Sequence, residues 1–487
     1  MSEIDEEQPY ICHECVSDEF LNKEIRCEGK CEKCSYCGKN RKAIQLSTLA
    51  ESIHCAIEQH FHLTSSEPSA FENAMLSDRE SSYWWARSGQ PIHDLIQDVA
   101  GIGEGAAADI QEYLSTSYGY YDPSDYESED PYGADACYEE SPPDSHEFHE
   151  SWELLRQEIT YRARFFSKFA EQVLDKLFGN LDALEVFDGK SVVRIAGPDT
   201  ENPDIFRARV AQTRDSLEQV LKDPVKELAA PPPKSAKHGR MNPACISVFY
   251  GATDAETCIS EVRPPIGSHV VVGRFQIIRN IRLLDLNILS EIYVKGSCFD
   301  PDFKTRKEHA AFFQHFVGEL TKPVMPDEET FEYLPTQIVA EYLAEKVEPR
   351  LDGIMFESSQ AQGKGQNIIL FHDSCFLEPY DLPSGATVSI NYGWSSPDDY
   401  DDSITVCEDL PTTPQQKQFK VVEIDDQGNP LVNNPITLSL DINNDIDVMA
   451  IKGATYQSHI RSVSRYRRNK SAGESLSPSI VKLDSLF

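Results

Sequence analysis

Cysteines are crowded at the start of this chain, where six of the thirteen lie within the first forty residues. Two Cys-x-x-Cys pairs, Cys12 with Cys15 and Cys34 with Cys37, are separated by eighteen residues, and Gly38 supplies a tight turn after the second pair. Four thiolates at such a spacing can surround Zn²⁺ as a tetrahedron, and four sulfurs leave no open position for catalysis. We therefore predict a small structural zinc unit over residues 1–40.

Two alternatives to this ligand set remain open from the sequence. Cys27 or Cys31 could replace one of the four ligands, and the cysteines could instead be reduced thiols in a small core or form an occasional disulfide. A segment with so few large apolar residues would be hard to fold without metal.

Length and charge exclude several classes of protein. A chain of 487 residues is too long for one ordinary core, so two or three folding units are expected. The 81 acidic against 45 basic residues give a net charge of −36, which repels phosphate backbones and argues against a nucleic-acid partner. Because there is no apolar run of about 18 residues and no signal-like start, we expect a cytoplasmic protein without membrane association.

The region after the cysteines is predicted to be helical. Apolar residues recur at helical spacing over residues 44–61 and 92–114, and the second stretch is broken between Gly101 and Gly105. We predict an all-α domain over residues 41–190, with an acidic solvated linker at 121–150. A single long helix is expected from Ser151, as its N-cap, to Leu177.

Past residue 190 the sequence changes to short β-rich runs. These runs alternate with helices, of which residues 335–346 are one, and they cover residues 246–251, 269–278, 281–286 and 367–371. The alternation predicts a mixed α+β domain over 195–380. Residues 381–487 form a C-terminal extension to which we assign no role. It has two expected strands, 387–394 and 417–425, and a basic tail at 459–470.

Five polar residues stand out among the apolar runs of the α+β region. They are Arg207, Arg209, Arg240, Tyr250 and Glu261. A buried arginine is costly without an anion, and a bidentate phosphate contact is its natural compensation. The structural alternative for each residue is an arginine–glutamate ion pair or a strand aromatic.

The order and spacing of these residues carry more information than any one of them. Arg240, Tyr250 and Glu261 lie ten and then eleven residues apart, and Ser358 and Asn367 follow later. This arrangement resembles the RES family, the toxin half of bacterial toxin–antitoxin pairs.

Further motifs of the family occur in the same order. An Arg-x-Arg strand is matched at 206–209, and a Gly-Arg-Trp-Asn turn at 239–242 with Met241 in place of the tryptophan. A Leu-Leu-Asp-Leu motif is matched at 283–286 and an Asn-x-x-x-Phe strand at 367–371.

The N-terminal part resembles the HEPN/RES N-terminal domain found ahead of some RES domains. Arg87 and His93 fit the spacing of the ribonuclease motif of HEPN enzymes, but Gly89 and Pro91 between them would break a helix. We therefore expect a structural or regulatory role for these helices and no ribonuclease activity.

The resemblance implies a mixed sheet like that of ADP-ribosyltransferases and a substrate, NAD⁺, that is cleaved between nicotinamide and ribose. Glu261 would stabilise an oxocarbenium-like ribose, and Arg240 would hold the pyrophosphate or ribose. Tyr250 would stack on or orient the nicotinamide ring, and Ser358 would form a hydrogen bond with the nicotinamide ribose or amide.

The resemblance also implies residues that bind the dinucleotide without acting on it. Arg207, Arg209 and Asn367 are assigned to this group. The zinc of Cys12, Cys15, Cys34 and Cys37 would be structural and remote from the reaction.

Three functions follow as hypotheses. The first is an NAD⁺ glycohydrolase toxin, and the second an ADP-ribosyltransferase that modifies a protein. The third is a non-catalytic, zinc-dependent binding or sensor protein. An antitoxin or immunity protein is a candidate partner, and self-association into a homo-oligomer is left open.

Overall fold

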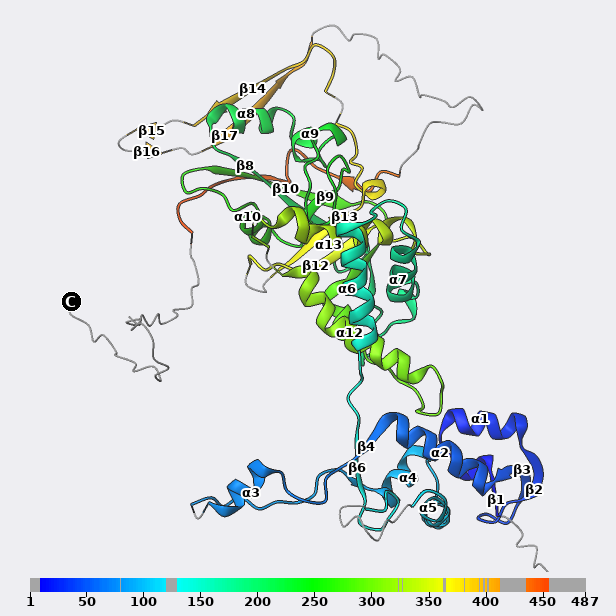
Figure 1. Ribbon diagram of the computed structural model, residues 1–487. Helices are drawn as coiled ribbons and strands as arrows, with labels where there is room; N and C mark the ends of the chain where they lie inside the picture. Colours follow the sequence, from blue (N-terminus) through cyan, green and yellow to red (C-terminus); the bar gives the residue numbers. More distant parts are fainter. Residues whose placement is uncertain are drawn as a thin grey trace, which may run out of the picture.

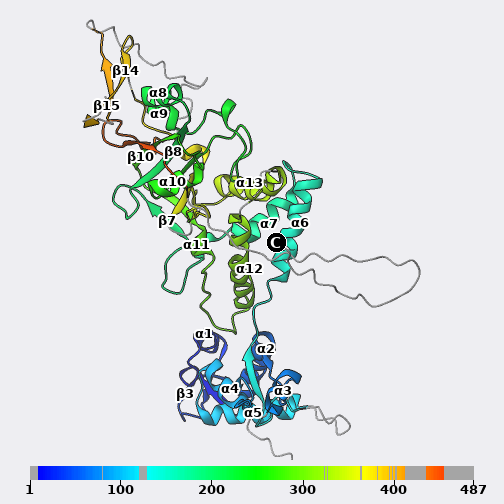
Figure 2. The ribbon, with the colours of Figure 1, turned by 90° about the vertical axis from the view of Figure 1, so that its left-hand side faces the viewer.

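The computed structural model describes residues 9–454, except 79, 120–128, 323, 326, 362–364, 381, 394, 397–398, 401–402 and 412–434. They form an N-terminal lobe and a larger lobe built on a sheet, as Figures 1 and 2 show from two directions. The two-lobe layout agrees with the expectation from chain length. Among the described residues, no helix is both long and apolar enough to cross a membrane.

The N-terminal lobe has the helices that periodicity predicted. They are α1 (Glu19–Glu28), α2 (Leu46–His60), α3 (Ala70–Ser77), α4 (Ile92–Ala100) and α5 (Glu104–Tyr118). Helices α2, α4 and α5 bury Ile53, Ile96 and Ile110 in one core. Gly101 ends α4 in a left-handed conformation with φ +60°, which explains the break between the two helices.

The prediction that this region is all-α is wrong. Strands β1 (Tyr10–Cys12), β3 (Asn40–Gln45) and β2 (Lys30–Lys33) form one antiparallel sheet in that order, and β4 (Phe61–Leu63), β6 (Cys137–Glu140) and β5 (Gln90–Pro91) form another. These strands are short, and β2 is exposed along its whole length. The sequence therefore lacks the alternation of apolar and polar residues that would predict them.

The predicted linker at 121–150 is wrong in the part that the structure describes. Strand β6 lies inside that segment and joins β4 to β5, while Tyr132 and Tyr138 are buried in the core of the lobe. The acidic composition hid these contacts, because only a few aromatic side chains of the segment point inward.

The long helix expected from Ser151 is also a wrong prediction. The structure has two helices, α6 (His146–Tyr161) and α7 (Lys168–Phe178), and the Ser151 hydroxyl donates to the carbonyl of Glu147 within α6. The Ser167 side chain caps α7 by accepting a hydrogen bond from the amide of Ala170 (3.2 Å). The break between α6 and α7 therefore covers residues 162–167.

The larger lobe is a mixed sheet with helices on both faces, so the α+β expectation is confirmed. The strands of its main path run in the order β18, β10, β8, β9, β13, β12, β11 and β7, and β19 also pairs with β10. Only β11 and β12 among these pair in parallel. Their bounds are β7 Val193–Ala196, β8 Asp204–Ala211, β9 Phe249–Ala252, β10 His269–Ile277, β11 Ile281–Asp285, β12 Gly353–Glu357, β13 Gln366–Leu370, β18 Leu438–Ser439 and β19 Ile446–Ala450.

Alternate residues of the central strands face two different cores. Ile369 joins a core with α6, α7, α12 (Phe303–Thr321) and α13 (Glu329–Glu345), whereas Ile368 and Leu370 face the other side. That second core includes α8 (Arg214–Lys222) and α9 (Pro224–Leu228). Two short helices, α10 (Ala255–Val262) and α11 (Leu286–Leu289), follow β9 and β11. Helix α13 begins at Glu329 rather than at the expected Pro335.

The described part of the C-terminal extension completes the sheet. Strands β18 and β19 pair antiparallel with β10 and so cover its outer edge. Strand β14 (Thr387–Tyr392), which the sequence predicted, pairs with β17 (Ile404–Asp409), and β15 (Ser395–Ser396) pairs with β16 (Asp399–Tyr400). The strand expected at 417–425 and the basic tail at 459–470 lie outside the described residues.

The two lobes meet at the N-terminal end of α12 (Figure 1). Lys307 of α12 forms an ion pair with Glu140 of β6, and the rings of Phe303 and His60 lie 5.6 Å apart. Helices α6 and α7, which we grouped with the N-terminal region, pack in the core of the larger lobe.

Candidate active site

Two of the predicted site residues, Ser358 and Asn367, converge on one carboxylate oxygen of a third, Glu261. Glu261 projects from α10, and its Oε1 accepts hydrogen bonds from the hydroxyl of Ser358 (2.6 Å) and from Nδ2 of Asn367 (2.8 Å). Strand β13 pairs with β9 on one side and β12 on the other, so Asn367 of β13 and the end of β12 lie beside the helix that follows β9. The pairing of these strands thus brings Glu261 close to Ser358 and Asn367, which lie about a hundred positions later in the sequence.

Ser358 lies behind this carboxylate and is 1% exposed. Its hydroxyl donates to Glu261 and accepts from the amides of Gln360 (3.2 Å) and Ala361 (3.1 Å). The expectation that Ser358 bonds directly to substrate ribose or amide does not fit this geometry, because its donor is already used. Its neighbour Ser359 is the serine that lines the cavity described below.

Tyr250 is joined to the predicted Gly-Arg-Met-Asn turn. Its hydroxyl donates to Oδ1 of Asn242 (2.8 Å) and accepts from the amide of Met241 (3.2 Å). A side chain at Gly239 would place a Cβ only 2.6 Å from that hydroxyl, which explains the glycine. Burial raises the pKa of Tyr250 to about 12, so the phenol is neutral at physiological pH.

Arg240 is held by the end of α12. Its Nη1 donates to the carbonyl of Leu320 (2.5 Å) and its Nη2 to that of Lys322 (2.6 Å). The guanidinium also lies 5.6 Å from the ring centre of Tyr333. These contacts fix the position of Arg240 without neutralising its charge.

Arg207 is a half-buried cation without a counter-ion among the described residues. Its Nη1 is buried and has no hydrogen-bond partner there, and its guanidinium lies 4.7 Å from the ring centre of Phe249. Burial lowers the pKa of Arg207 to about 10. An unpaired buried charge of this kind is costly, and a bound anion would compensate it.

A cavity of about 430 Å³ collects these groups. Arg207, Arg240, Tyr250, Glu261 and Asn367 all line it. Its size is typical of pockets that hold small ligands.

Arg209 lies apart from the cavity lining. Its guanidinium forms an ion pair with Glu227 (2.6 Å) and also donates to the Glu227 backbone carbonyl. The structure therefore brings together every predicted residue of this site except Arg209, with Ser358 placed behind Glu261.

Sequence reasoning missed Arg263, which also lines the cavity. It caps α10 with a left-handed backbone, φ +44°, two residues after Glu261. Nothing in the residue pattern signals this conformation, since left-handed caps are usually glycine.

The four predicted zinc ligands form one cluster in the N-terminal lobe. The sulfur of Cys12 lies 3.8 Å from that of Cys15 and 3.6 Å from that of Cys37, and the sulfurs of Cys34 and Cys15 are 3.8 Å apart. All four sulfurs lie within 4.8 Å of one another. A tetrahedron with Zn–S bonds of about 2.3 Å has edges of about 3.8 Å, so the donor set fits zinc.

Local backbone geometry supports this cluster. Gly38 adopts φ +71° and donates its amide to the carbonyl of Cys34 (2.9 Å), which is the predicted tight turn. Burial opposes ionisation of the Cys34 thiol, but backbone amides of Cys37 and Tyr36 outweigh it and lower the pKa of Cys34 to about 7. Cys27 and Cys31 are exposed and are not part of the cluster.

Two family models match the chain. The RES domain matches residues 206–392, and HEPN/RES N-terminal domain 1 matches residues 28–173. The chain therefore contains a RES domain preceded by a HEPN/RES N-terminal domain. At the family level this implies an NAD-related function of the toxin–antitoxin type. No curated protein and no solved structure matches the chain.

The RES match begins at β8, which carries Arg207, and reaches the end of β14, beyond the expected limit of residue 380. The HEPN/RES match ends within α7, so it includes α6 and the first part of α7, which pack on the sheet lobe.

The HEPN-like lobe does not present Arg87 and His93 as a helical pair. Arg87 precedes α4 in a segment without helix, and its guanidinium donates to Glu129 (2.6 and 3.1 Å) and to the carbonyl of Thr64 (2.6 Å). These contacts tie the segment before α4 to residues 64 and 129 of the same lobe.

Proposed function

We propose that this RES domain hydrolyses NAD⁺ to nicotinamide and ADP-ribose and acts as a toxin. The observation that carries the proposal is the Glu261 carboxylate, held on one oxygen by Ser358 and Asn367, at the edge of a cavity that contains the unpaired guanidinium of Arg207. A carboxylate and a buried cation in one cavity match the two charges of the substrate, the developing ribose cation and the pyrophosphate.

The reaction needs little proton transfer to the leaving group. The bond between ribose C1′ and the nicotinamide nitrogen breaks, its electron pair leaves with the nicotinamide, and a neutral molecule departs. A water oxygen then bonds to C1′ and releases a proton. The protein has to stabilise the oxocarbenium-like ribose, and Glu261 is the residue that would do so.

The orientation of Glu261 suits this role. Both hydrogen bonds go to Oε1, and among the described residues Oε2 has no hydrogen-bond partner. We assign Oε2 to the ribose and Oε1 to the positioning contacts. Tyr250 is a neutral phenol at the cavity wall and would orient the nicotinamide ring, while Arg240 and Arg207 would hold the phosphates.

The zinc of the cysteine cluster has a separate, structural role in this proposal. Cys12, Cys15, Cys34 and Cys37 would hold it in the N-terminal lobe, and four sulfurs would leave no open position for catalysis. We also propose that the mixed sheet of the larger lobe has the fold of ADP-ribosyltransferases.

The test is Glu261→Gln, measured as release of nicotinamide from NAD⁺. The amide keeps the size of the carboxylate but cannot offset a positive charge, so kcat should fall by about 10²-fold or more with little change in NAD⁺ affinity. Glu256→Gln is the matched control, because Glu256 is exposed on the same helix and does not line the cavity. Full turnover in Glu261→Gln would remove this glutamate from the mechanism.

Product analysis separates the proposed function from its alternatives. Free ADP-ribose supports hydrolysis, and ADP-ribose attached to a protein band supports a transferase. Expression of the wild-type protein without a partner should drain cellular NAD⁺ and stop growth, while Glu261→Gln should be tolerated. Equal growth arrest by both proteins would point to another activity.

A further inference from the structure

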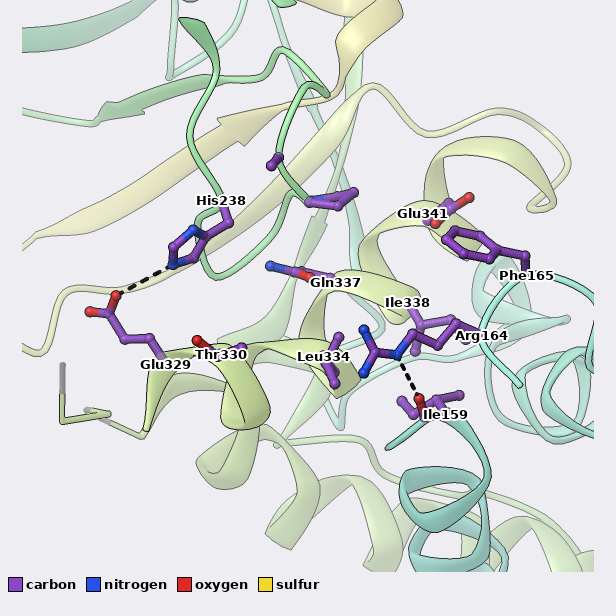
Figure 3. A pocket seen from close by; sticks show the side chains of 12 residues that line it. Ile159, Arg164, Phe165, His238, Glu329, Thr330, Leu334, Gln337, Ile338 and Glu341 are labelled. Atoms are coloured by element: carbon purple, nitrogen blue, oxygen red, sulfur yellow. Dashed lines mark hydrogen bonds and ion pairs between the residues drawn. The ribbon is translucent and has the colours of Figure 1, made fainter. Parts of the chain in front are cut away.

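A second cavity, of about 330 Å³, is lined in part by His238, Pro243 and Ala244, which flank the Gly-Arg-Met-Asn turn in the sequence (Figure 3). Leu334 and Ile338 of α13 form one wall, and Arg164 and Phe165, from the break between α6 and α7, form another. The cavity exists because this segment is not helical, since Arg164 and Phe165 belong to the break.

The two cavities share part of their walls. His238 and Glu329 line both, and their Nε2 and Oε2 atoms lie 3.8 Å apart. The two cavities are therefore neighbours, and this pair lies at their common border.

The two cavities differ in chemistry. Three arginines and Glu261 line the first, whereas aliphatic side chains and Phe165 dominate the second. A dinucleotide has the same asymmetry, because its pyrophosphate and reactive ribose are polar and its adenine is a flat, weakly polar ring.

Two planar groups at the second cavity suit a purine. Phe165 is 87% exposed, which is unusual for a large aromatic side chain and leaves its face free to stack. Arg164 is held in place by a hydrogen bond from its Nε to the carbonyl of Ile159 (3.0 Å; Figure 3), so its guanidinium is pre-oriented. Glu341 supplies a carboxylate that can accept a hydrogen bond from an exocyclic amine.

We infer that this second cavity binds the adenine end of the dinucleotide, with Phe165 and Arg164 as its stacking groups. The inference rests on the proposed function and deepens it, because it makes the substrate a full dinucleotide that bridges both cavities. A mononucleotide of nicotinamide would occupy the first cavity alone.

Phe165→Ala tests the inference, with Phe166→Ala as the matched control. Phe166 is the next residue, is 96% exposed and does not line the cavity. Because Phe165 is also exposed, neither change should affect folding. Binding is measured by calorimetry on the Glu261→Gln background, with NAD⁺, AMP and nicotinamide mononucleotide as ligands.

Loss of stacking on one base should weaken NAD⁺ and AMP binding by about tenfold in Phe165→Ala, while binding of nicotinamide mononucleotide stays within twofold. Phe166→Ala should match the parent for all three ligands. Unchanged AMP binding, or equal weakening for all three ligands, would overturn the adenine site. Failure of the proposed function would look different, since the wild-type protein would then release no nicotinamide from NAD⁺.

Discussion

The cysteine cluster and the Glu261 site are built in opposite ways. All four cysteines lie between residues 12 and 37, close to the same small antiparallel sheet. The Glu261 site takes residues from 207 to 367, carried by several strands of one large sheet and by α10. A cluster of the first kind depends on local spacing, and a site of the second kind depends on correct strand register across the whole lobe.

The two sites also differ in the kind of partner that their side chains lack. The four sulfurs form a set that one metal ion would complete, and metal binding of this kind contributes directly to folding. Arg207 is instead a half-buried cation whose Nη1 has no partner among the described residues, and in the proposed function the substrate phosphates would pair with it. Loss of zinc should therefore unfold the N-terminal lobe, whereas absence of the substrate should leave the sheet lobe folded.

The largest effect is expected for Cys34→Ser, which removes a buried zinc ligand. Elemental analysis should find about one zinc per wild-type chain and none in the variant, and the N-terminal lobe should lose stability. Nicotinamide release per folded molecule should change less than twofold, because the Glu261 site has no contact with the cluster.

Cys27→Ser is the matched control for that experiment. Cys27 is exposed and outside the cluster, so this variant should keep its zinc and its thermal stability. Zinc retained in Cys34→Ser but lost in Cys27→Ser would show that the ligand set is wrong.

Arg207→Met should separate stability from activity in the sheet lobe. Removing an unpaired buried charge should raise the Tm of the unliganded protein by roughly 2–4 °C. The loss of a charge-assisted phosphate contact should lower kcat/KM for NAD⁺ by about 30-fold. The measurements are thermal unfolding and steady-state kinetics.

Arg209→Met provides the control for Arg207, since Arg209 is paired with Glu227 outside the cavity. It should leave kcat/KM nearly unchanged. An equal loss of activity in both variants would show that Arg209 also binds the substrate and would contradict its position outside the cavity.

A smaller effect is expected for Ser358→Ala. This residue positions Glu261 without lining the cavity, so kcat should fall by about tenfold while KM stays within twofold. Ser359→Ala, which removes a hydroxyl that lines the cavity but does not contact Glu261, should leave kcat nearly unchanged. A rise in KM alone for Ser358→Ala would indicate direct substrate contact and argue against a positioning role.

Much of this organisation could be predicted from the sequence, because it depends on the spacing of residues that are near one another in the chain. Cys-x-x-Cys spacing selected the four clustered cysteines, and helical periodicity placed α2, α4 and α5. The ordered motifs identified the RES domain and residues that meet at the cavity, among them Glu261 and Asn367. Each of these signals is local, or is a series of local signals in a fixed order.

Only the tertiary structure decided how these parts are used. Ser358, just after the end of β12, donates its hydroxyl to Glu261, and Arg209 forms an ion pair with Glu227 outside the cavity lining. The helix expected from residue 151 to 177 breaks over residues 162–167, and Arg164 and Phe165 of this break line a cavity that the apolar periodicity does not indicate. These outcomes depend on which strands and helices become neighbours, and that choice is made by packing between segments far apart in the chain.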